Sequence, residues 1–359
     1  MKHEKFFSSS LLKWNNTGNT RQMPWKGEKD PYKIWISEII LQQTRVQQGI
    51  TYYNRFINVF PNVKSLAIAP QKKVYKLWEG LGYYSRCKNL IETAKFIHKR
   101  LNDKFPEEFE NILALKGIGS YTASAIASFA YNKPYAVLDG NVFRVLSRFF
   151  GVEIPVNTTE GKKFYGQLSQ LLLDKKNPGV YNQSIMDFGA VICKPLSPLC
   201  LECPLQNKCA AFLNNKVQDL PVNNKTIKQK ERFLNYLVIE YRNKFYITKR
   251  TQKDIWQNLY EFILIETKFR LNGKDLLKEG ALLKGFKENE FELNPDSKKI
   301  SQKLTHQLIA GQFFYIKIKK PLKLPKQYFL VTKDQIKMLP FPKLIASYFT
   351  EKNVPLDLF

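Results

Sequence analysis

The sequence predicts a two-domain protein in which an all-α domain is followed by a smaller α+β domain. Its 359 residues, 44% of them hydrophobic, are enough for about two buried cores, which excludes a disordered chain and a disulfide-stapled miniprotein. In the first two thirds of the chain, apolar residues recur at helical spacing between short breaks of glycine, proline or asparagine. Beyond residue 209 the pattern changes to short apolar runs typical of strands.

The helical domain is predicted to occupy residues 1–213. Asp30 and Pro31 indicate a helix start, because aspartate is a favoured N-cap and proline a favoured first helical residue. The run 34–41 is apolar nearly all round, which is typical of a buried helix. Further helices are expected, in chain order, at 74–81, 87–101, 122–131, 142–149, 160–173 and 181–193.

The segment 214–231 is polar and basic and is predicted to link the helical domain to a second domain at 232–359. Strands and helices alternate irregularly in this second domain, so a mixed α+β architecture is expected. The apolar runs predict strands at 233–241, 244–249, 260–266, 313–319 and 327–332, and helices at 274–283 and 343–350.

The chain is strongly cationic, with 57 Lys and Arg against 31 Asp and Glu and a net charge of +26. A folded protein with this excess expects a polyanionic partner, and nucleic acid is the leading one. On charge alone, ribosomal contact or an anionic membrane surface stays an alternative. The chain has no apolar run long enough to span a membrane and no secretory or other targeting signal. We therefore expect a cytoplasmic monomer, nucleoid-associated if the source is prokaryotic.

Four of the five cysteines lie within one short segment. Their spacing is C-x6-C-x2-C-x5-C, with a single CxxC flanked by two wider loops. That spacing favours the four corners of a [4Fe–4S] cluster, whereas zinc ribbons usually pair two CxxC knuckles; structural zinc stays the alternative. Cys87 lies apart and is predicted to be a plain buried thiol. The predicted ligands are Cys193, Cys200, Cys203 and Cys209.

A glycine-rich turn precedes the helix expected at 122–131. Lys116, Gly117 and Gly119 form a G-x-G turn in which two glycines free the backbone for unusual φ angles. Backbone amides and the helix N-terminus would suit a phosphate group. Taken alone, the same turn is also compatible with an ordinary tight connection.

Two carboxylates stand out from their surroundings. Glu38 interrupts the apolar helix, so it must either pair with a cation or have a raised pKa, as a general acid requires. Asp139 ends an apolar run just before a helix, where an N-cap is the simple interpretation. An acid and a stabilising anion are also the pair that cleavage of a glycosidic bond uses.

The cysteine spacing, the G-x-G turn and their order resemble the endonuclease III (helix-hairpin-helix) superfamily of DNA glycosylases. Within that superfamily the chain is most similar to the MutY-type adenine DNA glycosylases. The resemblance covers nearly the whole chain and implies a hairpin at about 112–131, an iron–sulfur loop at 193–209 and a C-terminal Nudix-like domain. The similar segments are Trp35–Thr44, Gly80–Arg86, Tyr181–Gly189 and 253–262.

The resemblance implies removal of adenine opposite 8-oxoguanine or guanine in duplex DNA, after the adenine is flipped out of the stack. Glu38 would protonate adenine N7 and later activate water, while Asp139 supports the cationic sugar. Around them the resemblance implies three groups of contacts. Tyr121 and Asn141 would be polar helpers beside the two carboxylates. The flipped adenine or the DNA would be contacted by Trp25, Lys26 and Gln183. Gln43 and Tyr83 would wedge into the duplex, with Thr44 nearby.

Two positions depart from the family or its lyase relatives. Lyase members carry a lysine where this chain has Tyr121, so a monofunctional glycosylase is favoured. Lys26 replaces the usual arginine, which weakens any contact that needs a planar fork. A glycosylase/lyase of the same fold and a catalytically idle DNA-binding protein stay the alternatives.

The predicted second domain lacks the dense acidic helix of a Nudix hydrolase, because its glutamates are scattered. We therefore expect a recognition module and no second activity. Leu304, Thr305 and His306 lie where the family has a Phe-Ser-His loop that inspects 8-oxoguanine. Thr305 keeps the hydroxyl group, and Leu304 loses the aromatic contact.

Overall fold

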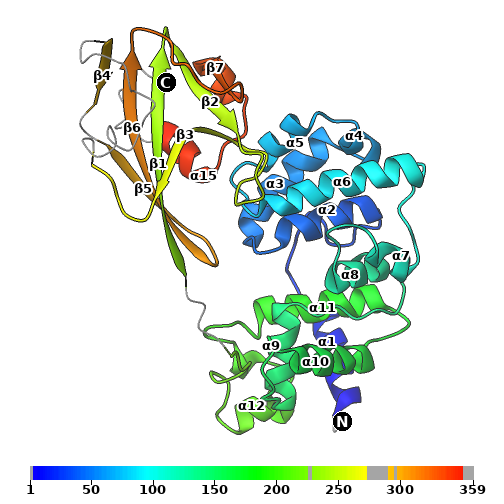
Figure 1. Ribbon diagram of the computed structural model, residues 1–359. Coiled ribbons are helices and arrows are strands. Elements are labelled where there is room, and N and C mark those ends of the chain that lie inside the picture. Colours follow the sequence, from blue (N-terminus) through cyan, green and yellow to red (C-terminus); the bar gives the residue numbers. More distant parts are fainter. Residues whose placement is uncertain (1–2, 225–228, 273–289, 295–296, 351–359) are drawn as a thin grey trace. The chain divides into compact units, whose positions relative to one another are not determined.

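The computed structural model describes residues 3–224, 229–272, 290–294 and 297–350 (Figure 1). The chain divides into a helical unit, Met1–Ile68 with Asn89–Lys225, and a sheet unit, Ala69–Lys88 with Thr226–Phe359. Residues 69–88, which the sequence places in the helical domain, therefore group with C-terminal residues; the boundaries at 213 and 232 stay predictions. Within the described residues, no helix has the length and hydrophobicity needed to cross a membrane.

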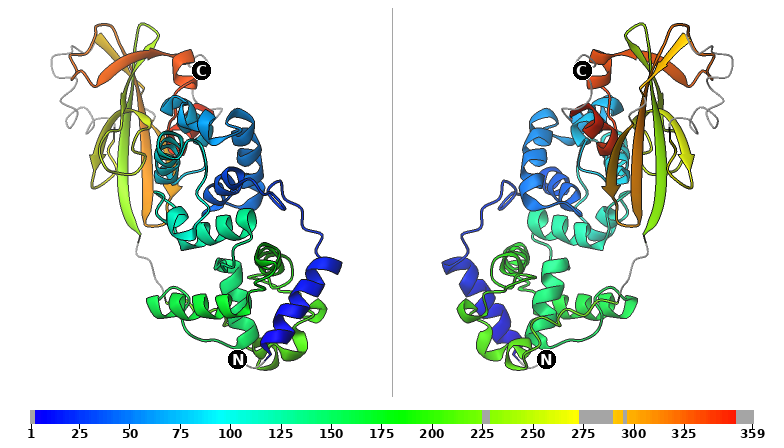
Figure 2. Two further views of the ribbon diagram at one scale, coloured as in Figure 1. Left: turned by 90° about the vertical axis from the view of Figure 1, so that its right-hand side faces the viewer. Right: turned by 90° about the vertical axis from the view of Figure 1, so that its left-hand side faces the viewer.

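The helical unit consists of helices with mostly short connections, apart from the longer segments 18–30 and 192–209 (Figures 1 and 2). The N-cap at Asp30 is confirmed, since its carboxylate accepts a 2.9 Å hydrogen bond from the Tyr32 amide. α6 (Tyr84–Arg100) begins in residues of the sheet unit and continues into the helical unit. The other helices are α1 (Glu4–Thr17), α2 (Pro31–Leu41), α3 (Val46–Val59), α4 (Val63–Ala67), α7 (Phe109–Leu113), α8 (Ser120–Tyr131), α9 (Gly140–Phe150), α10 (Thr159–Leu172), α11 (Pro178–Val191) and α12 (Ala210–Leu213).

Helix α1 was not predicted from the sequence, because three consecutive serines interrupt its apolar spacing. Phe7, Leu11 and Trp14 nevertheless bury one face of α1 in the main core of this unit. In the same unit, α8 packs against α2, α7 and α11, and α11 also packs against α9 and α1. The middle of α2 and the first turns of α8 and α9 are thereby brought together.

The sheet unit is built on a seven-stranded mixed sheet in the order β4-β6-β1-β3-β2-β7, with β5 also paired to β6. β1 and β6 are parallel, and the other pairs are antiparallel. α15 lies against the sheet, where Tyr348 stacks on Phe313 with ring centroids 4.5 Å apart. The elements are α5 (Gln71–Trp78), β1 (Lys230–Tyr241), β2 (Lys244–Lys249), β3 (Tyr260–Thr267), β4 (Phe291–Leu293), β5 (Lys298–Lys303), β6 (Gln307–Ile318), β7 (Tyr328–Thr332), α14 (Lys333–Lys337) and α15 (Lys343–Thr350).

The strand predictions need four corrections. β1 begins at Lys230, inside the segment predicted as a linker, because it pairs in parallel with β6 from there on. β6 begins at Gln307, six residues before the predicted start, and neither β4 nor β5 was predicted. β5 contains a single apolar residue, Ile300, so it shows no strand pattern. The helix predicted at 274–283 lies outside the described residues.

Helix α5 is held in the sheet unit by three hydrogen bonds to C-terminal residues. Lys76 donates to the Leu339 carbonyl at 3.1 Å. Glu79 accepts from the Phe341 amide at 2.8 Å. The hydroxyl of Tyr75 accepts from Asn258 at 3.1 Å.

Candidate active site

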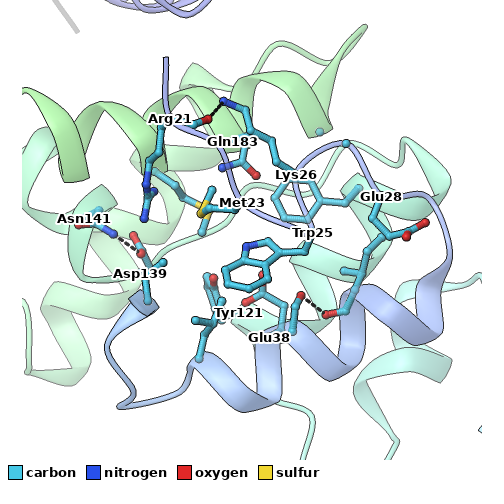
Figure 3. A pocket seen from close by; sticks show the side chains of 18 of the residues that line it. Arg21, Met23, Trp25, Lys26, Glu28, Glu38, Tyr121, Asp139, Asn141 and Gln183 are labelled. Atoms are coloured by element: carbon cyan, nitrogen blue, oxygen red, sulfur yellow. Dashed lines mark hydrogen bonds between the residues drawn. The ribbon is translucent and has the colours of Figure 1, made fainter. Parts of the chain in front are cut away.

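A pocket of about 730 Å³ opens in the helical unit between α2, α8, α11 and the start of α9 (Figure 3). The connection between α1 and α2 forms a further wall of it. The pocket collects most of the residues that the sequence singled out in this unit. They are Trp25, Lys26, Glu38, Gln43, Thr44, Tyr121, Asp139, Asn141 and Gln183.

Glu38 lies in the middle of α2 and is only 5% exposed. Burial raises its pKa from 4.5 to about 7. A hydrogen bond from Tyr121 opposes that rise, and the negative charge of Asp139 adds to it. Near neutral pH this side chain therefore exists partly as the neutral acid, which can donate a proton.

Tyr121 is in the first turn of α8, and its hydroxyl hydrogen-bonds to Glu38. Its pKa lies well above 10, chiefly because it is buried, so the phenol keeps its proton. The hydroxyl can thus donate to the Glu38 carboxylate once that group has lost its own proton.

Asp139 is the N-cap of α9, as predicted. One carboxylate oxygen accepts from the Val142 amide at 2.8 Å, and the other accepts from Asn141 Nδ2 at 2.8 Å. Burial raises its pKa above 3.8, while these hydrogen bonds and the charge of Arg144 act in the opposite direction. Both capping contacts favour the anion, so Asp139 presents an oriented carboxylate to the pocket.

Arg144 supports this arrangement and was missed by the sequence analysis. It donates to Asn141 Oδ1 at 2.9 Å, to the Gly189 carbonyl at 2.7 Å and to the Cys193 carbonyl at 2.8 Å. Its guanidinium therefore joins α9 to the end of α11 and to the first cysteine. The sequence carried one signal, an arginine that falls on the apolar face of an amphipathic helix.

Asp187 is a second residue that the sequence analysis missed, although it lies in a segment quoted for the family resemblance. It is fully buried in α11 behind the pocket wall. Arg21 and Lys26, both on that wall, form ion pairs with it at 2.8 and 3.0 Å. As with Glu38, the signal is a carboxylate within an apolar helix.

The residues expected at the wedge and the lesion fall in different units. Gln43 follows α2 with φ 56°, an unusual conformation for a residue other than glycine, and it lines the pocket beside Thr44. Tyr83 belongs to the sheet unit and is 46% exposed. Its hydroxyl hydrogen-bonds to Thr305, which with His306 lies in the turn between β5 and β6.

The glycine-rich turn connects α7 to α8, and one expectation about it was wrong. Gly117 has φ 81°, and a Cβ added there would lie 2.6 Å from Asn89 Cβ, so glycine is required. Gly119 has an ordinary φ of −96° and serves as the N-cap of α8. Lys116 is exposed and forms an ion pair with Glu92.

The four cysteines predicted as ligands follow α11 in the chain, and Cys193, Cys203 and Cys209 pack against the main core of the helical unit. Burial, with smaller contributions from the charges of Cys193, Cys209 and Cys200, raises the pKa of Cys203 to about 12. Arg148 faces this set, with a guanidinium nitrogen 3.6 Å from Cys193 Sγ. In the part of the chain that is described, no three His, Cys, Asp or Glu side chains gather closely enough to hold a single metal ion. A thiolate set beside an arginine fits an iron–sulfur centre in its donor chemistry.

Cys87 stands apart from this set, as predicted. It is fully buried, and burial raises the pKa of its thiol well above the ordinary value. The thiol is thus held in its unreactive, neutral form.

Comparison with known proteins bears on both units. The HhH-GPD superfamily of base excision DNA repair proteins matches residues 36–162, and the NUDIX domain matches residues 235–351. The adenine DNA glycosylase of Buchnera aphidicola subsp. Schizaphis graminum is 40% identical over 266 residues, which cover 74% of this chain and 76% of that protein. The adenine DNA glycosylase of Homo sapiens is 39% identical over 215 residues, covering 57% of this chain and 39% of that protein.

Among solved structures, a thermostable thymine-DNA glycosylase superposes with a TM-score of 0.55 at 29% identity. The match covers 59% of this chain and 98% of that one. The predicted fold class, a helix-hairpin-helix glycosylase domain followed by a Nudix-like α+β domain, is confirmed.

Proposed function

The chain belongs to the family of adenine DNA glycosylases, and from that premise we propose that it hydrolyses the N-glycosidic bond of adenine opposite 8-oxoguanine or guanine in duplex DNA. The partner is double-stranded DNA, which suits a net charge of +26. The target adenine leaves the stack and enters the pocket of the helical unit, because its glycosidic bond is out of reach inside the duplex.

The observation that carries this proposal is a buried acid with a pKa of about 7 in the same pocket as a capped aspartate. Glu38 protonates the departing adenine, which makes the base a better leaving group. The Asp139 carboxylate stabilises the positive charge that develops on the sugar as the bond breaks. Glu38, now ionised and hydrogen-bonded by Tyr121, then takes a proton from the attacking water.

The remaining pocket residues bind and orient the DNA. Trp25 and Gln183 contact the flipped adenine, and Asn141 holds Asp139 in place through the 2.8 Å hydrogen bond. The Lys26 ammonium is engaged by the Asp187 carboxylate at 3.0 Å and by the Arg21 carbonyl at 2.8 Å, so it is not free to act as a nucleophile for lyase chemistry.

DNA contacts outside the pocket complete the proposal. Gly117 and Gly119 let backbone amides at the start of α8 approach a phosphate, with Lys116 beside them. Gln43 and Tyr83 wedge into the duplex, with Thr44 beside Gln43. Thr305 and His306 inspect the base opposite the adenine.

We also propose that a [4Fe–4S] cluster is held by Cys193, Cys200, Cys203 and Cys209. When bound, it fixes the surrounding loop through iron–thiolate bonds and takes no part in bond cleavage. The charge of Arg148 beside Cys193 would offset the negative charge of the thiolates.

Single-turnover assays with duplexes carrying adenine opposite 8-oxoguanine, guanine, cytosine or thymine test the function. We expect adenine release opposite the first two, strand breakage only after alkali, and no covalent adduct with borohydride. Asp139→Asn should abolish release and keep duplex binding, because asparagine still caps α9. Exposed Asp219→Asn is the matched control. Efficient borohydride trapping would favour the lyase, and normal turnover by the Asp139 variant would refute the catalytic assignment.

A further inference from the structure

Asp187 is the centre of a polar cluster behind one wall of the pocket. Its side chain is completely buried in α11. One carboxylate oxygen accepts from Arg21 at 2.8 Å and from Gln183 Nε2 at 2.9 Å. The other accepts from Asn19 at 2.9 Å and faces Lys26 Nζ at 3.0 Å. Four donors from two segments of the chain therefore converge on one anion.

This cluster fixes which end of the Gln183 amide faces the pocket. An ionised carboxylate only accepts hydrogen bonds, so the NH₂ group of Gln183 must face Asp187. The amide oxygen then points away from the carboxylate, and Figure 3 shows it on the side that Trp25 and Lys26 line. Turning the amide over would place its oxygen against the Asp187 oxygen, which is repulsive and leaves Arg21 as the one remaining donor to that oxygen among the contacts described above.

We propose that Asp187 is a positioning residue that locks the Gln183 amide so that the pocket accepts a nucleobase with an exocyclic amine and rejects one with an exocyclic carbonyl. The proposal rests on the proposed function for the nature of the ligand. An exocyclic amine donates to the exposed amide oxygen, whereas a carbonyl at the same position meets it oxygen to oxygen. Arg21 and Lys26 contact the two oxygens of the buried carboxylate at 2.8 and 3.0 Å and hold it in this orientation.

Adenine and hypoxanthine differ in the relevant groups and make the test direct. Hypoxanthine replaces the exocyclic amine of adenine by a carbonyl in a ring of the same size. In Asp187→Asn the new side chain can present its own NH₂ to Gln183. The glutamine can then turn over and donate to a carbonyl. Asparagine has a single side-chain oxygen, so in either orientation its NH₂ group faces Arg21 or Lys26 where an oxygen stood before. Neither orientation is therefore strongly favoured.

The experiment measures single-turnover release of adenine and of hypoxanthine, each opposite 8-oxoguanine, by the wild-type protein and the variant. We expect the adenine-to-hypoxanthine rate ratio to fall about tenfold in Asp187→Asn. A factor of about ten corresponds to the loss of one hydrogen bond that distinguishes the two bases. An unfolded fraction lowers both rates equally and leaves the ratio unchanged. If Asp187→Asn lowers both rates by the same factor, the residue is only structural and the proposal is overturned.

Gln183→Leu keeps the proposal testable even if Asp187→Asn does not fold, because leucine has neither amide group. We expect it to lower the ratio to the same level, and we expect the double variant to lower it no further. A wild-type ratio in Gln183→Leu overturns the proposal.

Equilibrium binding distinguishes a failure of the proposed glycosylase function from a failure of the proposed role of Asp187. Duplexes with non-hydrolysable 2′-fluoro analogues of the adenine and hypoxanthine nucleotides should show the same loss of preference in Asp187→Asn. If the wild-type protein releases no adenine but prefers the adenine analogue, the proposed function fails and the role of Asp187 stands. Equal affinity of the wild-type protein for both analogues would overturn the role of Asp187.

Discussion

Replacing Glu38 by glutamine should stabilise the protein above neutral pH while slowing adenine release by several orders of magnitude. Burial raises the pKa of Glu38 from 4.5 to about 7, a difference equivalent to about 3 kcal/mol. The pKa of Glu38 is higher in the folded state than in the unfolded state. Below pH 4.5 the side chain is protonated in both states, so its burial does not lower the free energy of unfolding there. The folded state then loses stability as the pH rises to about 7. Glutamine never ionises, keeps the size of glutamate and can still accept a hydrogen bond from Tyr121.

Thermal melting of both proteins between pH 5 and pH 8 measures the effect. The melting temperature of Glu38→Gln should exceed that of the wild type by about 6 °C or more at pH 8, and the difference should shrink towards zero in acid. Single-turnover adenine release should fall by about 10²–10⁴-fold, the usual contribution of a general acid. Exposed Glu107→Gln is the control and should show neither change. A melting difference that is the same at pH 5 and pH 8 would refute the buried-acid assignment.

The remaining predictions concern the surroundings of the site. Tyr121→Phe removes the donor that lowers the pKa of Glu38, so the fall in adenine release at alkaline pH should move upward by about one pH unit; an unmoved profile contradicts the contact. Arg148→Ala removes hydrogen bonds to the carbonyls of Lys194, Pro195 and Leu220 and should lower the free energy of unfolding by about 3 kcal/mol, with faster loss of bound iron on dilution. Lys116→Ala should reduce the slope of log affinity against log salt by about 0.9 for undamaged duplex DNA, and an unchanged slope would show that Lys116 touches no phosphate.

Local patterns in the sequence were enough to single out the two carboxylates, Glu38 and Asp139, that line the pocket. Glu38 is conspicuous because nearly all of its neighbours along the helix are apolar, with Ser37 as an exception, and that pattern predicts its burial. The capping role of Asp139 is equally local, since its partner, the Val142 amide, is three residues away. The G-x-G turn was located correctly, although only Gly117 uses a positive φ angle.

Contacts between segments far apart in the sequence were not predictable in the same way. Asp187 binds Arg21 across 166 positions, and Arg144 binds the carbonyl of Cys193 across 49. No periodicity within one segment signals such a partner. β5 escaped prediction for a related reason, because its strand state depends on pairing with β6 and hardly on its own composition.

Because Ala69–Lys88 belongs to the same compact unit as the C-terminal residues, no single cut of the chain separates the two units. A truncation that ends before β1 would strip α5 of the Leu339 carbonyl, the Phe341 amide and the Asn258 side chain at once. In such a shortened protein, the residues of α5 would lose these hydrogen-bond partners. A loss of activity could then come from disturbed packing of α5 as well as from the absence of the second unit. Point changes in the turn between β5 and β6 are the cleaner way to learn what the second unit contributes.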